Sequence, residues 1–208
     1  MYRPNHFQPS TDEQWIQLIK DNPLATVISN GAKNLEISLT PVSINNDHSS
    51  LEGHFAKKND ILSLFAKHKR ATFLFQGPNG YISPSLFISS PHLPTWNYSM
   101  VEIQADVTLI NDKMEVMVLL NKLTKKFDRN FSHFQRSQDY VDLIDAAAKE
   151  VVGFRAEIID MKAKFKLSQN KQQSDINVLI TALRQSEDAD RDTLADLIER
   201  QLYNELKT

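Results

Sequence analysis

Apolar and polar residues alternate with a period of two in several stretches of this chain, and this period predicts β-strands. The alternation is clearest from Tyr98 to Ile110, where apolar residues occupy every second position. Shorter stretches rich in β-forming residues predict five more strands, at Leu24–Ser29, Leu35–Ile44, Leu51–Phe55, Ala71–Gln76 and Val151–Met161. Asn30-Gly31 is a strong turn signal between the first two strands, so we expect an antiparallel meander there.

Apolar residues at helical spacing predict helices between and after these strands. Ser10 and Glu13 read as a capping box, so a helix is expected from there to Pro23. Further helices are expected at Asp60–His68, Asp112–Phe127, Gln138–Lys149, Asp175–Arg184 and Asp190–Leu206. Strands with interspersed helices and no regular βαβ alternation indicate an α+β fold with a closed or partly closed sheet.

Composition narrows the classes of protein that are possible. The 208 residues suffice for one sizeable domain, or for a domain with a small helical appendage. A net charge of −2 argues against a chain that coats nucleic acid through bulk charge. The absence of cysteine excludes disulfides, thiolate catalysis and cysteine-bound metals. No secretory signal or membrane-spanning stretch is visible, so we expect a cytoplasmic protein without membrane contact, and no metal site is indicated.

Turn residues, amides, hydroxyls and aromatics are unusually dense in the segments Phe75–Ser85 and Pro94–Tyr98. Loops held by a rigid scaffold are where binding groups tend to lie. Gln76 ends an apolar strand, where its amide is placed to contact the edge of a flat ligand. The alternative for Gln76–Gly80 is a simple tight turn, because proline, asparagine and glycine favour one.

These two segments resemble the signature of the PaiB-type, FMN-binding negative transcriptional regulators, which are relatives of the split-barrel flavoproteins. Other ordered segments are similar to the same family, namely Met1–Phe7, Gly53–Asn59, Val152–Arg155 and Lys166–Asn170. The resemblance implies a split β-barrel of antiparallel strands with peripheral helices over residues 1–170. It also implies a C-terminal helical extension over residues 171–208, which packs on the barrel or on the dimer, and a homodimer with the cofactor at its interface.

FMN needs cations or hydroxyls for its phosphate and apolar or aromatic walls for its ring. The resemblance therefore implies a set of cofactor-binding residues: His54, Lys57, Asn59, Gln76, Gly77, Ser83, Ser85, Trp96 and Tyr98. Structural alternatives stay open for several of them. Lys57 and its neighbour Lys58 are either phosphate ligands or solvated loop charges. Ser83 and Ser85 are either ligand donors or ordinary turn hydroxyls, and Trp96 either lies against the flavin or seals the core.

The chain departs from the family pattern at four positions. Leu39 lies where a histidine is expected, and Asp60 replaces a proline. Leu86 and Phe87 replace a tryptophan-tyrosine pair. Each change removes a polar, rigid or aromatic group, so the departures bear on cofactor affinity more than on the fold.

Two functions are open at this point, and no nucleophile–base pair is indicated for either. One is an FMN-binding negative transcriptional regulator; the other is a flavin-dependent oxidoreductase, either a flavin reductase or similar to pyridoxamine-phosphate oxidase. The last predicted helix is mainly acidic, with Asp190, Asp192, Asp196, Glu199 and Glu205 against Arg191, Arg200 and Lys207. Such a face repels phosphate, so we expect no direct DNA binding through it.

Overall fold

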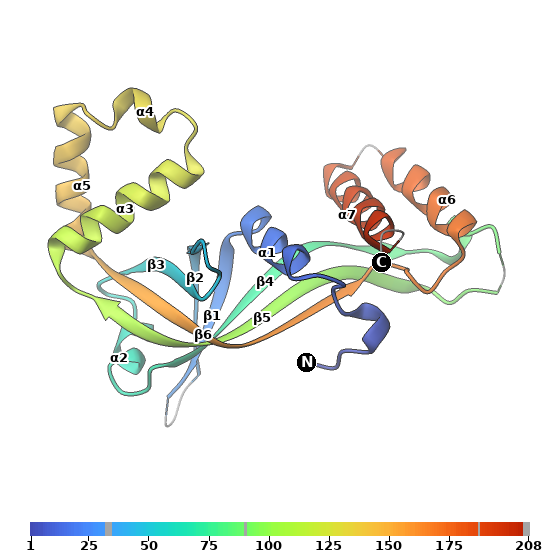
Figure 1. Cartoon of the computed structure of the whole chain (residues 1–208), viewed down its shortest axis with the longest axis horizontal. Coiled ribbons are helices and arrows are strands. Elements are labelled where there is room, and N and C mark those ends of the chain that lie inside the picture. Colours follow the sequence, from blue (N-terminus) through green and yellow to red (C-terminus); the bar gives the residue numbers. More distant parts are fainter. Residues whose placement is uncertain (32–34, 90, 187, 206–208) are drawn as a thin grey trace. The chain divides into compact units, whose positions relative to one another are not determined.

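Six antiparallel strands form a closed barrel in the computed structural model, which describes residues 1–31, 35–89, 91–186 and 188–205 (Figure 1). The order around the barrel is β1-β2-β3-β6-β5-β4. The strands are β1 (Leu24–Asn30), β2 (Leu35–Ile44), β3 (Ser50–Ala56), β4 (Arg70–Ile82), β5 (Thr95–Ile110) and β6 (Val151–Lys166). The predicted α+β split barrel is confirmed.

Nine helical segments accompany the strands in the described part of the chain. They are η1 (Asn5–Phe7), α1 (Asp12–Asp21), α2 (Ile61–Phe65), η2 (Pro84–Leu86), α3 (Lys113–Phe127), α4 (Phe131–Phe134), α5 (Gln138–Glu150), α6 (Gln173–Arg184) and α7 (Ala189–Glu205). None of the described helices is both long and apolar enough to cross a membrane.

The chain forms two compact units, and each is described by itself. The barrel unit comprises Pro23–Leu74 and Ile103–Met161. The terminal unit comprises Met1–Asn22, Phe75–Glu102 and Lys162–Thr208. The strands β4, β5 and β6 each contribute residues to both units.

A cluster of aromatic rings fills the core of the barrel unit. Phe154 on β6 is fully buried and stacks on Phe55 of β3, with the ring centroids 5.0 Å apart. Phe73 of β4 lies 5.8 Å from Phe154. Gly53 leaves room for this stack, because an added Cβ would lie 2.7 Å from Phe154 Cζ. The inward side of β3 is therefore shaped around one phenylalanine.

A buried carboxylate fixes α3 against the barrel within the same unit. Glu52 of β3 accepts hydrogen bonds from Lys122 of α3 and from Arg155 of β6. Burial alone would raise the pKa of Glu52, but the two cationic donors outweigh it and lower the pKa. The carboxylate therefore stays charged at neutral pH.

The terminal unit holds the predicted C-terminal pair of helices. Apolar residues of α6 and α7 are buried, including Leu179 and Leu183 on the first and Leu194 and Ile198 on the second. Gln201 of α7 pairs with the Gln14 side chain of α1 at 2.7 Å. The pair thus packs against the N-terminal helix, and a domain boundary near residue 170 stays a prediction.

Several sequence predictions need correction at element ends. The first helix is capped one residue later than predicted, with Thr11 as N-cap and the Gln14 side chain accepting from the Thr11 backbone N–H. The tight turn considered for Gln76–Gly80 is wrong, because β4 continues to Ile82 and no described glycine has positive φ. Asn30, where the turn was predicted to begin, is still the last residue of β1 and is paired with Leu35 of β2, and residues 32–34 of the connection lie outside the described residues.

Candidate functional site

His54 is the most informative of the predicted cofactor residues in the barrel unit. It is half-buried on β3, and its Nδ1 atom is buried without a hydrogen-bond partner among the described residues. Burial lowers the pKa of His54, so the imidazole is neutral at pH 7. A buried ring nitrogen without a partner is costly unless a ligand or water supplies one. His54 therefore offers one hydrogen bond to a bound molecule.

Lys57, Lys58 and Asn59 follow β3 in the same unit. Both lysines are exposed, and no ion pair is recorded for either within the described chain. The Lys57 backbone N–H donates to the Glu150 carbonyl at 2.9 Å, so the main chain there is fixed while the side chain stays available. Asn59 Oδ1 accepts from Ser38 Oγ at 3.0 Å and from the Ile61 N–H at 3.1 Å. Asn59 thus stabilises the start of α2 in addition to any contact with a ligand.

Apolar side chains predominate on the outer surface of β1 and β2, where Thr26 and Asn30 are the polar residues. Leu35, Ile37 and Leu39 occupy alternate positions of β2 and are 54, 58 and 64% exposed. Leu24 at the start of β1 is also exposed, and the register pairs it with Pro41. Exposed apolar side chains that lie side by side in this way are typical of surfaces that contact another molecule. We call this the β1–β2 face.

Gln76 and Gly77 lie on β4, in the terminal unit. The Gln76 side chain is exposed, and its contact with a ligand stays a prediction. Gly77 is buried, and an added Cβ would overlap Ser99 Oγ of β5 and lie 3.1 Å from Leu18 of α1. The absence of a side chain at Gly77 is therefore explained by the close approach of β4 to its neighbours.

Ser83 and Ser85 bond to each other around η2. Their hydroxyls are 2.8 Å apart, and the Ser85 N–H donates to Ser83 Oγ at 3.3 Å. This arrangement is a serine cap of a short 3-10 helix, so the pair has a structural role whatever else it contacts.

Trp96 and Tyr98 form the aromatic part of the predicted set, on one side of β5. Trp96 is 54% exposed, so the alternative in which it seals the core is wrong. Its ring contacts Tyr81 of β4 edge-on, with centroids 6.3 Å apart. Tyr98 is half-buried against the Lys164 ammonium, 5.3 Å from the ring centroid. Trp96 and Tyr81 together present exposed aromatic surface suited to a flat ring.

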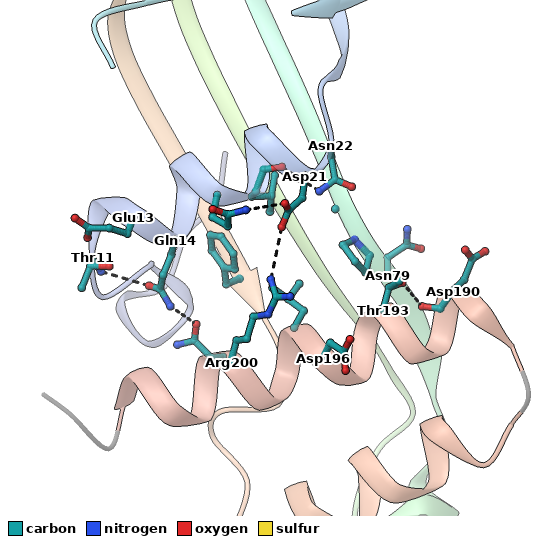
Figure 2. A pocket seen from close by; sticks show the side chains of 17 residues that line it. Thr11, Glu13, Gln14, Asp21, Asn22, Asn79, Asp190, Thr193, Asp196 and Arg200 are labelled. Atoms are coloured by element: carbon teal, nitrogen blue, oxygen red, sulfur yellow. Dashed lines mark hydrogen bonds and ion pairs between the residues drawn. The ribbon is translucent and has the colours of Figure 1, made fainter. Parts of the chain in front are cut away.

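A large cavity of about 880 Å³ lies in the terminal unit, between α1, α7 and the Gly77–Asn79 segment of β4 (Figure 2). Its charged lining residues are mainly acidic: Glu13, Asp21, Asp190 and Asp196, with Arg200 as the cation. Arg200 lies 3.6 Å from Asp21, which neutralises one of these charges. The excess of carboxylates makes this cavity unsuited to the phosphate of FMN.

The nine predicted residues are divided between the two units. His54, Lys57 and Asn59 belong to the barrel unit, and the other six belong to the terminal unit. The chemistry fits FMN in kind, because the chain offers a neutral imidazole with an unused nitrogen, free ammonium groups and an exposed aromatic surface. Their assembly into one cofactor site stays a prediction.

A closed antiparallel barrel with flanking helices and groups that fit a flavin defines the class of split-barrel flavoproteins. Residues 1–160 match the model of a family described as "Putative FMN-binding domain". The chain belongs to this family, and the prediction of FMN as cofactor is confirmed at the level of the family.

Two further comparisons bear on the family and on the fold. The chain is 28% identical over 211 residues to "Protease synthase and sporulation protein PAI 2" of Bacillus subtilis (strain 168), covering 99% of this chain and 100% of that protein. The resemblance to the PaiB-type family is thereby confirmed. Among solved structures, the flavocytochrome Anf3 of Azotobacter vinelandii has a TM-score of 0.63 at 11% identity, covering 85% of this chain and 78% of that one.

A second solved structure is similar to the same extent. The FAD and heme binding protein of Mycobacterium smegmatis has a TM-score of 0.60 at 15% identity, covering 82% of this chain and 78% of that one. Both structures share the fold with this chain, and at these identities the fold is all that the likeness shows.

Sequence analysis missed three features that the structure brings together. The acid-lined cavity joins residues from both ends of the chain, and only the acidic character of the last helix signalled it. The apolar β1–β2 face was not predicted, because the sequence pattern of β2 indicates a strand without showing which of its residues are exposed. A smaller, basic pocket combines the segment around His92 with the Lys166–Asn170 motif, which the family resemblance had singled out without a role.

Proposed function

We propose that this chain forms a cytoplasmic homodimer that binds FMN at its interface and acts as a negative transcriptional regulator. The observation that carries the flavin part is the buried, unpartnered Nδ1 of His54 on β3, a strand that two exposed lysines directly follow in sequence. The regulatory part is supported by the likeness to the PaiB-type relative in Bacillus subtilis, "Protease synthase and sporulation protein PAI 2".

In this proposal, each group has one task. His54 hydrogen-bonds a heteroatom of the isoalloxazine ring, and Lys57 pairs with the phosphate. Trp96 and Tyr98 lie against the ring system, from the same subunit or across the dimer. Gln76, Gly77, Asn59 and the two serines complete the wall. Bound FMN would supply hydride or electron transfer, and the protein residues orient it and shield it from water.

The dimer is supported by the β1–β2 face. The register pairs Ile28 with Ile37, so apolar residues from both strands lie side by side on the outside of the barrel. The same strands point Ala25, Val27 and Val42 into the core. A strand pair that is apolar on both faces is typical of a sheet covered on both sides, and a second copy is the partner that a closed twofold contact requires.

Replacing Ile37 by Lys is expected to shift the dimer toward monomer, because it places a charge at the centre of the β1–β2 face. Sedimentation velocity over a range of protein concentrations measures the shift. Ile159→Lys is the matched control: Ile159 is also an exposed isoleucine of the barrel unit, 48% accessible, on β6. Equal dissociation of both variants, or of neither, would contradict an interface on the β1–β2 face.

Lys57→Ala is expected to lower the affinity for FMN by about tenfold or more and to leave the affinity for riboflavin almost unchanged, since only FMN carries the phosphate. Titration followed by quenching of flavin fluorescence gives both affinities. Lys67→Ala, an exposed lysine beyond the other end of α2, is the control. Equal loss for both ligands would remove Lys57 from the phosphate-binding role.

We propose that α6 and α7 do not contact DNA directly, and the charges on these two helices support this. Arg184 of α6 pairs with Asp196 at 2.9 Å and Glu199 at 2.8 Å, so its charge is already neutralised. The exposed start of α7 carries Asp190 and Asp192. A mobility shift with target DNA that survives physiological salt would contradict this part of the proposal. FMN-dependent oxidation of NAD(P)H would instead support the alternative, a flavin-dependent oxidoreductase.

A further inference from the structure

The basic pocket is a second cavity within the terminal unit, with a volume of about 430 Å³. It lies where the segment leading into β5 meets the segment between β6 and α6. Its polar lining residues are His92, Thr95, Asn97, Lys166, Ser168, Asn170 and Lys171. No carboxylate is among the described residues that line it. Its size falls in the range of about 300–1,000 Å³ that is typical of small-molecule sites.

Two lysines give this pocket its charge. The Lys166 ammonium donates to Thr95 Oγ1 and to the Trp96 carbonyl at 2.8 Å. Burial lowers the pKa of Lys166, and the charges of Lys164 and Lys171 also lower it, against the opposing effect of Tyr98. No ion pair is recorded for Lys166 or Lys171 in the part of the chain that the structure describes. The pocket therefore holds positive charge that the protein does not neutralise.

Asp175 of α6 is the nearest candidate counter-charge, but it is used elsewhere. Its Oδ1 atom accepts from the backbone N–H groups of Ile88 at 2.8 Å and Ser89 at 3.0 Å. Its Oδ2 atom accepts from Ser89 Oγ. The carboxylate thus anchors the segment that carries His92 through three donors that do not line the pocket, and its Oδ2 atom also lies 3.5 Å from Nε2 of His92.

His92 links this anchor to Lys171. Lys171 Nζ lies 2.9 Å from His92 Nδ1, and Ser89 Oγ lies 2.8 Å from His92 Nε2. An ammonium can only donate, so Nδ1 is the acceptor and the ring proton sits on Nε2. Ser89, His92 and Asp175 do not form a catalytic triad, because the serine and the carboxylate approach the same ring nitrogen. The neutral imidazole instead holds the Lys171 ammonium at the pocket.

Ser168 shows that the pocket wall is held in a strained conformation. It is a buried residue other than glycine with φ of 66°. Its hydroxyl is fixed by Asn97 through two hydrogen bonds, at 2.9 and 3.2 Å. Gln169 holds the next turn by accepting from the Leu167 N–H at 2.7 Å. Strained backbone that neighbouring groups over-determine is characteristic of ligand sites.

We infer that the basic pocket binds a phosphate group. A phosphate monoester carries a charge of about −1.5 to −2 at pH 7, which matches two ammonium groups, whereas a carboxylate carries one charge and two oxygens. Lys166 and Lys171 supply the charge, and the Thr95 hydroxyl and the Asn170 amide, which also line the pocket, complete the donor set. The phosphate comes either from FMN or from another small phosphate compound. The inference does not depend on the proposed function, since none of these residues belongs to the predicted flavin set.

The direct test uses inorganic phosphate as the probe, with chloride at equal ionic strength as the reference. Phosphate is expected to shift the backbone amide resonances of Ser168 and Lys171 in ¹H–¹⁵N spectra. We expect each of the variants Lys171→Gln and Lys166→Gln to lower the affinity for inorganic phosphate by about tenfold or more, because each loses a charge-assisted hydrogen bond. Lys67→Gln is the matched control in the barrel unit. Unchanged phosphate affinity in both pocket variants, or shifts confined to other residues, would overturn the inference.

FMN and riboflavin titrations of Lys171→Gln then identify the source of the phosphate. If the variant loses inorganic phosphate and also the preference for FMN over riboflavin, the pocket holds the flavin's own phosphate, and Lys57 loses the role proposed for it. If it loses inorganic phosphate but keeps that preference, the pocket serves a separate phosphate compound and the proposed flavin site stands. If inorganic phosphate and FMN both bind to the variant as they bind to the wild-type protein, the pocket inference fails and the proposed function is untouched.

Discussion

Phe154→Ala is expected to lower the free energy of unfolding by about 3–5 kcal/mol, the usual cost of truncating a buried phenylalanine. Phe154 has no exposed surface, stacks on Phe55 and lies close to Phe73. Its removal leaves a cavity between β3, β4 and β6 that rigid strands cannot close. Urea denaturation followed by far-ultraviolet circular dichroism measures the loss. Ile159→Ala on the same strand is the control, because an exposed side chain should cost about 0.5 kcal/mol or less.

Gly53 provides an internal check on this prediction. Gly53→Ala places a Cβ 2.7 Å from Phe154 Cζ and 3.0 Å from the Pro41 carbonyl, so overpacking should cost about 1–3 kcal/mol. In a Phe154→Leu background the ring is absent, and the cost of Gly53→Ala should fall. A double-mutant cycle measures the difference. An unchanged cost in both backgrounds would show that Gly53 does not accommodate Phe154.

The strands were predictable where one face is apolar and the other is polar. β5 shows this pattern along most of its length, and its central part was predicted correctly. The end of β4 was not predicted correctly, because the glycine, proline and asparagine residues found in this strand are also the residues that favour a turn. Gly77 allows β4 to pack closely against Ser99, and Gly80 allows it to pack closely against Leu194. Neither glycine adopts a positive φ. A single sequence does not distinguish these two uses of glycine.

A period of two also leaves open which face of a strand is buried. In β2, Val42 and Ile44 point into the core, whereas Leu35 and Ile37 point outward. Both sets are apolar, so the strand was predictable and its exposed apolar face was not. Only the register with β1 shows that the outward residues of the two strands form one surface.

The candidate site was predictable as a list of residue types more than as an arrangement. The family motifs led to Trp96 and Tyr98, and the structure adds that Trp96 is exposed and contacts Tyr81. The basic pocket was not predicted, because Lys166 and His92 are 74 positions apart and neither stands out alone. Their proximity follows from the pairing of β5 with β6, which no local pattern encodes.

Asp175→Asn is expected to destabilise the terminal unit at neutral pH and to release the segment that carries His92. The carboxylate accepts from the Ser89 hydroxyl and from the N–H groups of Ser89 and Ile88, and an amide replaces one acceptor oxygen by a donor. Hydrogen–deuterium exchange of the Ile88 and Ser89 amides should accelerate in the variant. Asp192→Asn, an exposed carboxylate of α7, is the control and should leave both amides protected.

The effect of Asp175 also depends on pH in a defined direction. The Ser89 hydroxyl above all, then the Ser89 and Ile88 N–H groups, lower the pKa of Asp175 from 3.8 to about 2, against the opposing effect of burial. Because the folded-state pKa is depressed, the stabilisation is complete above about pH 4 and is lost as the pH falls to about 2. The stability gap between the wild-type protein and Asp175→Asn should therefore be widest near pH 7 and shrink between pH 4 and 2, as measured by urea denaturation. A gap that stays constant over this range would show that the ionised carboxylate is not what holds the segment.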